Sequence, residues 1–189
     1  MEIVKKSKIA KNKAIKVLLA GGVVICPTDT VYGFLADATN KKAVEKIYKM
    51  KKRPRSKPLA VFVKDFKMAR SLAEINENQE RIVKKYWPGK FTFIFKRKKR
   101  IKIYDGAKNT IALRIPSYKF LNDLLKKINK PLVQTSVNIS GQPLLSKINN
   151  MKNQLGNKNI LLIDGGDLPK SKASTIIDLS KSKIEMLRK

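Results

Sequence analysis

Short apolar runs alternate along the chain with segments whose apolar residues recur every three or four positions. The first pattern is typical of buried strands, and the second is typical of helices with one buried face. The pattern predicts strands at residues 23–26, 59–63, 91–96, 110–115, 131–136, 160–164, 174–179 and 183–187, and helices at residues 10–20, 41–50, 67–74, 78–86 and 118–128. This alternation indicates an α/β fold.

Capping residues bound several of these predicted elements. Gly21 and Gly22 follow the first helix, where a C-cap is expected. Asn40 and Ser117 precede two other helices at positions that favour N-capping side chains. We find no internal repeat and no low-complexity linker, so we expect residues 1–189 to form one domain.

The composition allows a hydrophobic core without disulfides or a structural metal. Hydrophobic residues make up 42% of the 189 positions, and no run of 18 apolar residues predicts a membrane span. The basic, polar N-terminal segment has no apolar stretch of the kind found in secretory signals. Cys26 is the single cysteine of the sequence and suits a reducing compartment. We therefore expect a cytoplasmic protein without membrane contact.

The formal net charge of +29 has two readings. The 35 lysines and 8 arginines are spread along the whole chain rather than gathered in one arm. This distribution is typical of an AT-rich coding bias that leaves a solvated basic surface. The electric field of a positively charged protein also attracts RNA and other polyanions. The charge alone does not decide between these interpretations.

Several common kinds of catalysis are excluded by the sequence. It contains no histidine, which removes Ser-His and Cys-His nucleophilic catalysis and histidine metal sites. Neither a P-loop nor a dinucleotide-binding glycine motif is present. Cys26 ends an apolar strand and is expected in the core. Any chemistry therefore depends on positioning and charge compensation.

The segment PTDTVYGFLADA, residues 27–38, directly follows the first predicted strand. Polar groups at the carboxyl end of a strand in an α/β sheet face the crevice where ligands bind. Hydroxyls and one carboxylate are supplied there by Thr28, Asp29, Thr30 and Tyr32. The same residues are equally consistent with a structural turn.

A basic loop follows the second predicted helix. Six basic residues lie between Lys49 and Lys57, and Pro54 and Pro58 stiffen the segment. Ammonium and guanidinium groups on a rigid loop suit a polyphosphate. A solvated basic helix end is the alternative.

Two further segments carry candidate ligand groups. Arg114 lies in the otherwise apolar strand segment TIALRIP, where a guanidinium can bind a carboxylate through two hydrogen bonds. The segment QTSVNISGQPLLS leaves another strand and presents Ser136, Asn138 and Ser140. These short side chains suit phosphate or ribose, or they form an Asx or Ser turn.

Five of these motifs occur in a recognisable order. PTDTVYG, K-x-R-P, ALRIP, S-x-N-x-SG and ASTIIDLS together resemble the YrdC-like family of threonylcarbamoyl-AMP synthases, specifically its short bacterial type. The resemblance covers nearly the whole chain. It implies a twisted open mixed sheet, with helices packed around it and a basic concave cavity.

The resemblance also implies an activity. L-threonine, bicarbonate and ATP would be joined into threonylcarbamoyl-AMP with release of pyrophosphate, which makes the enzyme a nucleotidyltransferase. Mg²⁺ is expected to accompany ATP. Other tRNA-modification proteins would then receive the intermediate, and the chain would bind tRNA or double-stranded RNA at most weakly.

The family motifs imply site residues position by position. The K-x-R pair, Lys51 and Arg53, is expected to face the phosphates and to be catalytic. ATP contacts are implied at Arg53, Lys57, Thr110, Asn138, Ser146 and Arg188. Threonine contacts are implied at Thr30, Arg114, Ser136 and Ser174. Some relatives have a histidine where this chain has Phe62, so a substrate contact there is lost or replaced. No general base is identified.

Two other functions compete with the synthase. One is a basic RNA-binding module that acts in ribosome or tRNA maturation, which only the net charge supports. The other is a carbamoyl-transfer enzyme that shares the domain but normally carries additional ones.

Overall fold

The protein is described here by a computed structural model that covers residues 1–156, 159–169 and 171–189. Its strands are β1 (Glu2–Lys5), β2 (Val24–Cys26), β3 (Gly33–Asp37), β4 (Ala60–Phe62), β5 (Ala73–Glu74), β6 (Phe91–Arg97), β7 (Thr110–Arg114), β8 (Leu132–Ser136), β9 (Leu161–Asp164), β10 (Thr175–Asp178) and β11 (Glu185–Arg188). Its helices are α1 (Lys8–Leu19), α2 (Lys41–Lys51), α3 (Phe66–Leu72), α4 (Glu77–Lys84), α5 (Lys119–Ile128) and α6 (Ile148–Leu155).

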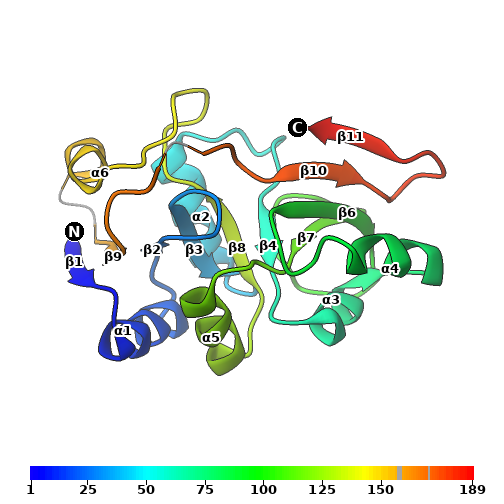
Figure 1. Ribbon diagram of the computed structural model, residues 1–189, viewed down its shortest axis with the longest axis horizontal. Coiled ribbons are helices and arrows are strands. Elements are labelled where there is room, and N and C mark those ends of the chain that lie inside the picture. The colour runs from blue at the N-terminus through cyan, green and yellow to red at the C-terminus, as the bar shows by residue number, and fades with distance from the viewer. Residues whose placement is uncertain (157–158, 170) are drawn as a thin grey trace.

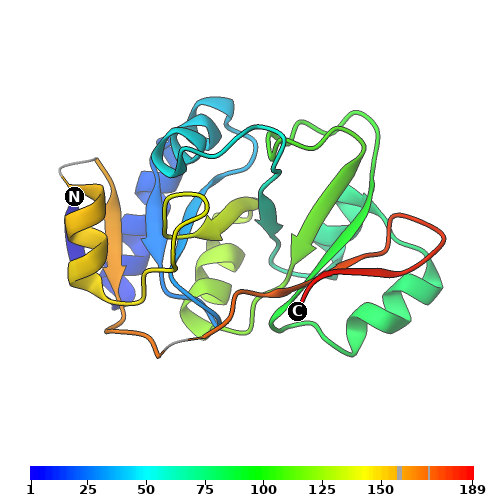
Figure 2. The same ribbon diagram turned by 90° about the horizontal axis from the view of Figure 1, so that it is seen from above.

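The described strands form one mixed sheet in the order β1-β9-β2-β3-β8-β4-β7-β6-β10-β11, with β5 beside β6. Parallel pairs, such as β4 with β7, occur together with antiparallel pairs, such as β3 with β8. Figure 1 shows the helices distributed around this sheet, and Figure 2 shows it extending from the β1–β9 edge to the β10–β11 hairpin. The expected twisted open mixed sheet is confirmed.

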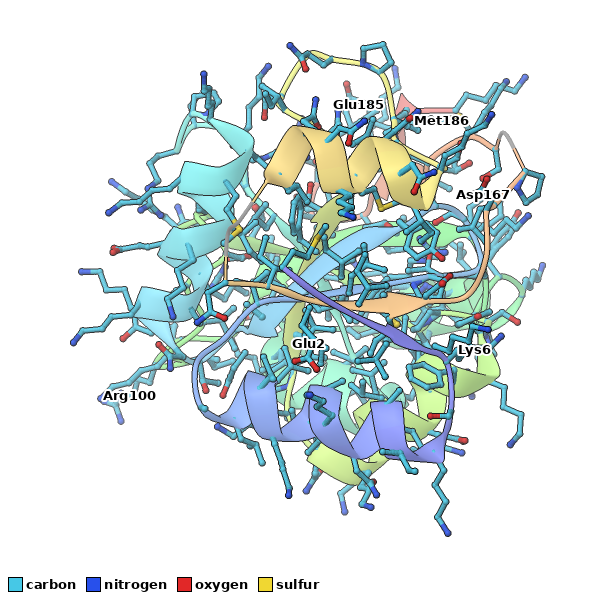
Figure 3. The ribbon with its side chains drawn as sticks, turned by 90° about the vertical axis from the view of Figure 1, so that its left-hand side faces the viewer. Glu2, Lys6, Arg100, Asp167, Glu185 and Met186 are labelled. Carbon is cyan, nitrogen blue, oxygen red and sulfur yellow. The ribbon has the colours of Figure 1, made fainter. Side chains whose placement is uncertain are left out.

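Two hydrophobic clusters hold the helices to the sheet. α1 and α5 pack through residues such as Leu18 and Leu124 against strand residues that include Phe62. The larger cluster joins α2, α3, α4 and α6 to the rest of the sheet. In Figure 3, α1 and α6 lie on opposite sides of the edge that β1 and β9 form. Three of the four residues of β9 are buried apolar residues, whereas β1 at the outer edge of the sheet is mostly exposed.

Strand β6 shows why one part of the sheet remains uncovered. Phe93 and Phe95 point into the core, where both rings lie against Trp87 at centroid distances of 5.6 and 6.2 Å. The alternate residues Thr92 and Ile94 face a cavity instead. This alternation follows from the two-residue period of a strand. A single strand therefore contributes both to the core and to the site.

Most predicted elements are present, with ends shifted by a few residues. Asn40 caps α2 as predicted, since its Oδ1 accepts a hydrogen bond from the Ala43 amide. The prediction that Ser117 caps α5 is wrong. The N-cap position is Tyr118, and the Ser117 amide donates to Asp29 Oδ2 at 3.0 Å. The backbone just before α5 is therefore held by a carboxylate that is distant in sequence, and no side chain caps the helix.

The sequence patterns missed β1, β3, β5 and α6. β3 lies within the motif that was interpreted as a turn, but its five residues are all buried and pair with both β2 and β8. Its pairing depends on strands that are distant in sequence. Within the described residues, no helix is long and apolar enough to cross a membrane.

We expect Phe93→Ala to lower the free energy of unfolding by about 3–5 kcal/mol, because the Phe93 side chain is fully buried among aromatic rings. Urea denaturation followed by circular dichroism measures this loss. Ile9→Ala is the control, since Ile9 is 78% exposed and its loss should change stability by no more than about 0.5 kcal/mol. Equal stability of both variants would contradict the core assignment.

Candidate functional site

A cavity of about 240 Å³ lies over the middle of the sheet. It collects side chains from segments that are far apart in sequence: the loop after β2, the loop after α2, and strands β4, β6, β7, β8, β10 and β11. Seven of the residues expected in the site line it, namely Thr30, Arg53, Thr110, Arg114, Ser136, Ser174 and Arg188. The fold therefore brings most of the expected residues to one place.

Small side chains leave the room for this cavity. Ala60 on β4 lies beside Ala112 on β7, and these two residues are flanked by Gln134 on β8 and Ile94 on β6. A methyl side chain extends only a short way above the sheet, so longer side chains at the edges enclose an open floor. The apolar floor suits the flat ring of a base or the methyl group of a small ligand.

Arg114 is held at one end of the floor by partners on three sides. Its Nη2 donates to Asp29 Oδ1 at 2.6 Å, its Nε donates to the Gly89 carbonyl at 2.9 Å, and its Nη1 donates to Thr30 Oγ1 at 3.3 Å. Burial lowers the pKa of Arg114, while Asp29 opposes this shift. A guanidinium has five N–H donors, so two remain for a ligand carboxylate.

Arg53 and Arg188 bring two more guanidinium groups to the cavity. Arg53 lies in the basic loop and donates to the carbonyls of Lys57 and Pro58. These two hydrogen bonds fix the orientation of its guanidinium group. Partial burial, together with the positive charges of Arg114 and Arg53, lowers the pKa of Arg188. Among the described residues that line the cavity, none is acidic. The cavity therefore attracts anions.

A hydroxyl pair connects Arg188 to β6. Arg188 donates through Nε to the Ser174 carbonyl at 2.8 Å and through Nη2 to Ser174 Oγ at 3.1 Å. Ser174 Oγ also lies 2.9 Å from Thr92 Oγ1, and both hydroxyl side chains are buried. Thr92 was not among the expected site residues. Its place as the single hydroxyl in the apolar segment FTFIF was the available sequence signal.

Lys51 is not among the residues that line the cavity, and its expected phosphate contact and catalytic role remain predictions. Its Nζ donates to the carbonyls of Ser136 and Asn138 at 2.6 and 2.9 Å and to Asn138 Oδ1 at 2.8 Å. Burial, with a smaller effect of Arg53, lowers the pKa of Lys51 to about 8. All three ammonium protons are used, so in this structure Lys51 positions the loop that carries S-x-N.

Asn138, Lys57 and Ser146 also lie outside the cavity lining. The side chain of Asn138 is engaged within its own loop, where Nδ2 donates to the Gln142 carbonyl and Oδ1 accepts from Ser136 Oγ. Lys57 is exposed and contacts Arg53 through its backbone carbonyl. Ser146 accepts a hydrogen bond from the Leu168 amide through its carbonyl. Their expected ATP contacts therefore remain predictions.

The described residues contain no group of three or more acidic, cysteine or histidine side chains able to hold a metal ion. Hard cations such as Mg²⁺ prefer oxygen ligands, and a cavity lined by guanidinium groups supplies no carboxylate for them. The site therefore fits a cation only if the cation is held by the oxygens of an anionic ligand.

We expect Lys51→Met to lower the free energy of unfolding by about 1–3 kcal/mol and to weaken nucleotide binding, because three buried acceptors lose their donor. Chemical denaturation and calorimetric titration with ATP measure the two effects. Lys49→Met changes an exposed lysine of the same helix and is the matched control. If Lys51→Met weakens ATP binding while stability is unchanged, the positioning role is wrong.

Comparisons with known proteins show the family of the chain. Residues 16–189 match the Sua5, YciO and YrdC protein family, whose description reads "Telomere recombination". A protein of Methanocaldococcus jannaschii, whose name gives threonylcarbamoyl-AMP synthase as an inferred activity, is 38% identical over 92% of this chain and 82% of its own length. A protein of Pyrococcus abyssi named threonylcarbamoyl-AMP synthase is 32% identical over 89% of this chain.

The structural likeness extends over almost the whole chain. The crystal structure of P. abyssi Sua5 complexed with L-threonine matches with a TM-score of 0.91 and 30% identity, and the match covers 99% of this chain and 56% of that one. The chain likewise spans 50% of the length of the Pyrococcus abyssi synthase. By sequence and by fold, this chain belongs to the Sua5, YciO and YrdC family.

Proposed function

We propose that the chain is a threonylcarbamoyl-AMP synthase. L-threonine and bicarbonate form a carbamate and water, and a carbamate oxygen then displaces pyrophosphate from the α-phosphorus of ATP. The products are threonylcarbamoyl-AMP, pyrophosphate and water. The names of the relatives support this activity. They do not favour the alternative of an RNA-binding module.

The observation that carries the proposal is the convergence of Arg53, Arg114 and Arg188 on one cavity whose described lining has no acidic residue. A triphosphate and an amino-acid carboxylate bring several negative charges to one place. Guanidinium groups that are already oriented by protein acceptors stabilise such charges without reorganisation during the reaction. Flat RNA-binding surfaces do not require an enclosed cavity of this kind.

Threonine is placed at the Arg114 end of the cavity. The two free N–H donors of Arg114 suit its carboxylate, and Thr30 lies within hydrogen-bond distance of the same guanidinium. Ser174 is the candidate partner for the threonine hydroxyl on the opposite wall. The fold match to a relative complexed with L-threonine supports this placement.

ATP occupies the remainder of the cavity and the adjoining basic loop. Arg53 and Arg188 face its phosphates, Thr110 offers a hydroxyl, and Ala60 with Ala112 supports the flat base. Mg²⁺ would accompany ATP and would neutralise part of the phosphate charge. This arrangement requires no protein ligand for the metal.

Catalysis by positioning is sufficient for both steps. The amine of threonine is the first nucleophile and the carbamate is the second, so no enzyme nucleophile is needed. Cys26 is fully buried, and burial raises the pKa of its thiol, which keeps it unreactive. As an adenylyl-transferring enzyme, the chain is a nucleotidyltransferase. Its product serves cytoplasmic tRNA-modification proteins.

We expect pyrophosphate release from ATP only when L-threonine and bicarbonate are both present. A coupled pyrophosphate assay with purified protein, with each substrate omitted in turn, measures this dependence. Mass spectrometry should detect threonylcarbamoyl-AMP in the complete mixture. Release of pyrophosphate without threonine, or RNA binding without any turnover, would overturn the proposed function.

We expect Arg53→Ala to lower kcat/KM for pyrophosphate release by roughly 100-fold, because an oriented cation is lost from the phosphates. The same coupled assay measures this decrease at saturating threonine. Arg81→Ala is the control, since Arg81 is an exposed residue of α4 outside the cavity. Unchanged activity of Arg53→Ala would remove Arg53 from the phosphate site.

A further inference from the structure

Gln134 is a buried polar side chain in the middle of the cavity that the motif comparison did not identify. It is 9% exposed and lines the cavity from β8. Among the residues that the structure describes, its amide has no hydrogen-bond partner, whereas Arg114, Ser174 and Asn138 are all held by protein groups. The Gln134 amide is open to the cavity rather than sealed in the core, so its donor and acceptor positions are available to a ligand.

The position of Gln134 limits which part of a ligand it reaches. It pairs with Ala60 on β4 and with Leu35 on β3, next to the alanine floor. Its Nε2 lies against the backbone of Gly33, where an added Cβ would approach it to 3.2 Å. Gln134 therefore lies two residues along the strands from the level of Arg114, because Gln134 pairs with Ala60 and Arg114 pairs with Phe62.

The charged groups near Gln134 are either cations or carboxylates that already have a partner. Arg53, Arg114 and Arg188 face the cavity from three different elements, and Lys51 lies behind β8. The nearby carboxylate of Asp29 is occupied by Arg114 and by the Ser117 amide. A ligand ammonium group therefore finds no free carboxylate in the described lining. The Gln134 Oε1 atom is a neutral acceptor in this region.

This inference rests on the proposed function. We infer that Gln134 accepts a hydrogen bond from the α-amino group of the threonine substrate and orients it for attack on bicarbonate. With the carboxylate held by Arg114, the amino group is the remaining polar donor of threonine near the alanine floor. The first step is R–NH₃⁺ + HCO₃⁻ → R–NH–COO⁻ + H₂O + H⁺, so the nitrogen must lose a proton before the C–N bond forms.

A neutral acceptor suits this step better than a carboxylate does. A carboxylate would stabilise the ammonium form and raise its pKa, whereas an amide surrounded by guanidinium groups leaves the charged form unfavourable. The nitrogen is then held in place while its protonated form is destabilised. Phe62, which lies on the neighbouring strand under the Arg114 guanidinium, has no polar group for this task.

The first test compares two ligands in the wild-type protein and in Gln134→Met, which keeps the size of the side chain and removes the acceptor. (R)-3-hydroxybutyrate retains the carboxylate, hydroxyl and methyl groups of L-threonine but lacks the amine. Calorimetry should show about 10-fold weaker L-threonine binding to Gln134→Met and unchanged binding of (R)-3-hydroxybutyrate. Equal weakening for both ligands, or none, would overturn the inference.

The second test introduces a carboxylate. Gln134→Glu should move the rising limb of the pH–rate profile by about 1 unit toward alkaline pH, because the carboxylate stabilises the ammonium form. A purely structural role of Gln134 would not produce this shift. Gln154→Glu on α6 is the matched control, since Gln154 lies outside the cavity lining and its profile should stay in place.

The two levels of the hypothesis fail differently. If wild-type protein releases no pyrophosphate with threonine and bicarbonate, the proposed function and this inference both fall. If the wild type is active and Gln134→Glu shows the unshifted profile, only the role of Gln134 is wrong. ATP affinity of each variant, measured in parallel, reports whether the cavity remains folded.

Discussion

The site depends on three guanidinium groups that are held around one cavity. The described lining of this cavity contains no acidic side chain to balance their charge. Arg53, Arg114 and Arg188 repel one another, and this repulsion contributes to the lowered pKa of Arg188. Each is oriented by fixed acceptors outside the ligand space, chiefly backbone carbonyls and Asp29. The uncompensated positive charge that remains is available to an anionic ligand, which relieves the repulsion when it binds.

The sheet makes this arrangement possible because each strand has two faces. β6 buries its phenylalanines against Trp87 and turns Thr92 and Ile94 to the cavity. β7 does the same, with Ile111 and Leu113 in the core. The core residues keep the strands rigid, and the alternate residues are free to be small or polar. Rigid strands place site residues more accurately than mobile loops do.

The basic loop residues contribute in different ways, although they are neighbours in sequence. Arg53 reaches the cavity, whereas Lys51 is buried beneath the loop after β8 and Lys57 is exposed. Elsewhere on the molecule, Figure 3 shows nitrogen-tipped side chains that project outward around the whole outline, with Arg100 among them. This distribution agrees with a generally solvated basic surface. Among the described features that we relate to function, only the cavity gathers several positive charges in one place.

The sequence by itself determined the α/β class, most strands and helices, and the family, because these depend on periodicity and on motifs whose order is visible in one dimension. It also identified seven residues that line the cavity. Only the tertiary structure decided which polar groups face the ligand space. Gln134 and Thr92 face it because of the alternation of side chains along their strands, and Lys51 turns away because one acceptor at the end of β8 and two in the following loop surround its ammonium group. Such outcomes depend on packing between distant segments, which local sequence does not encode.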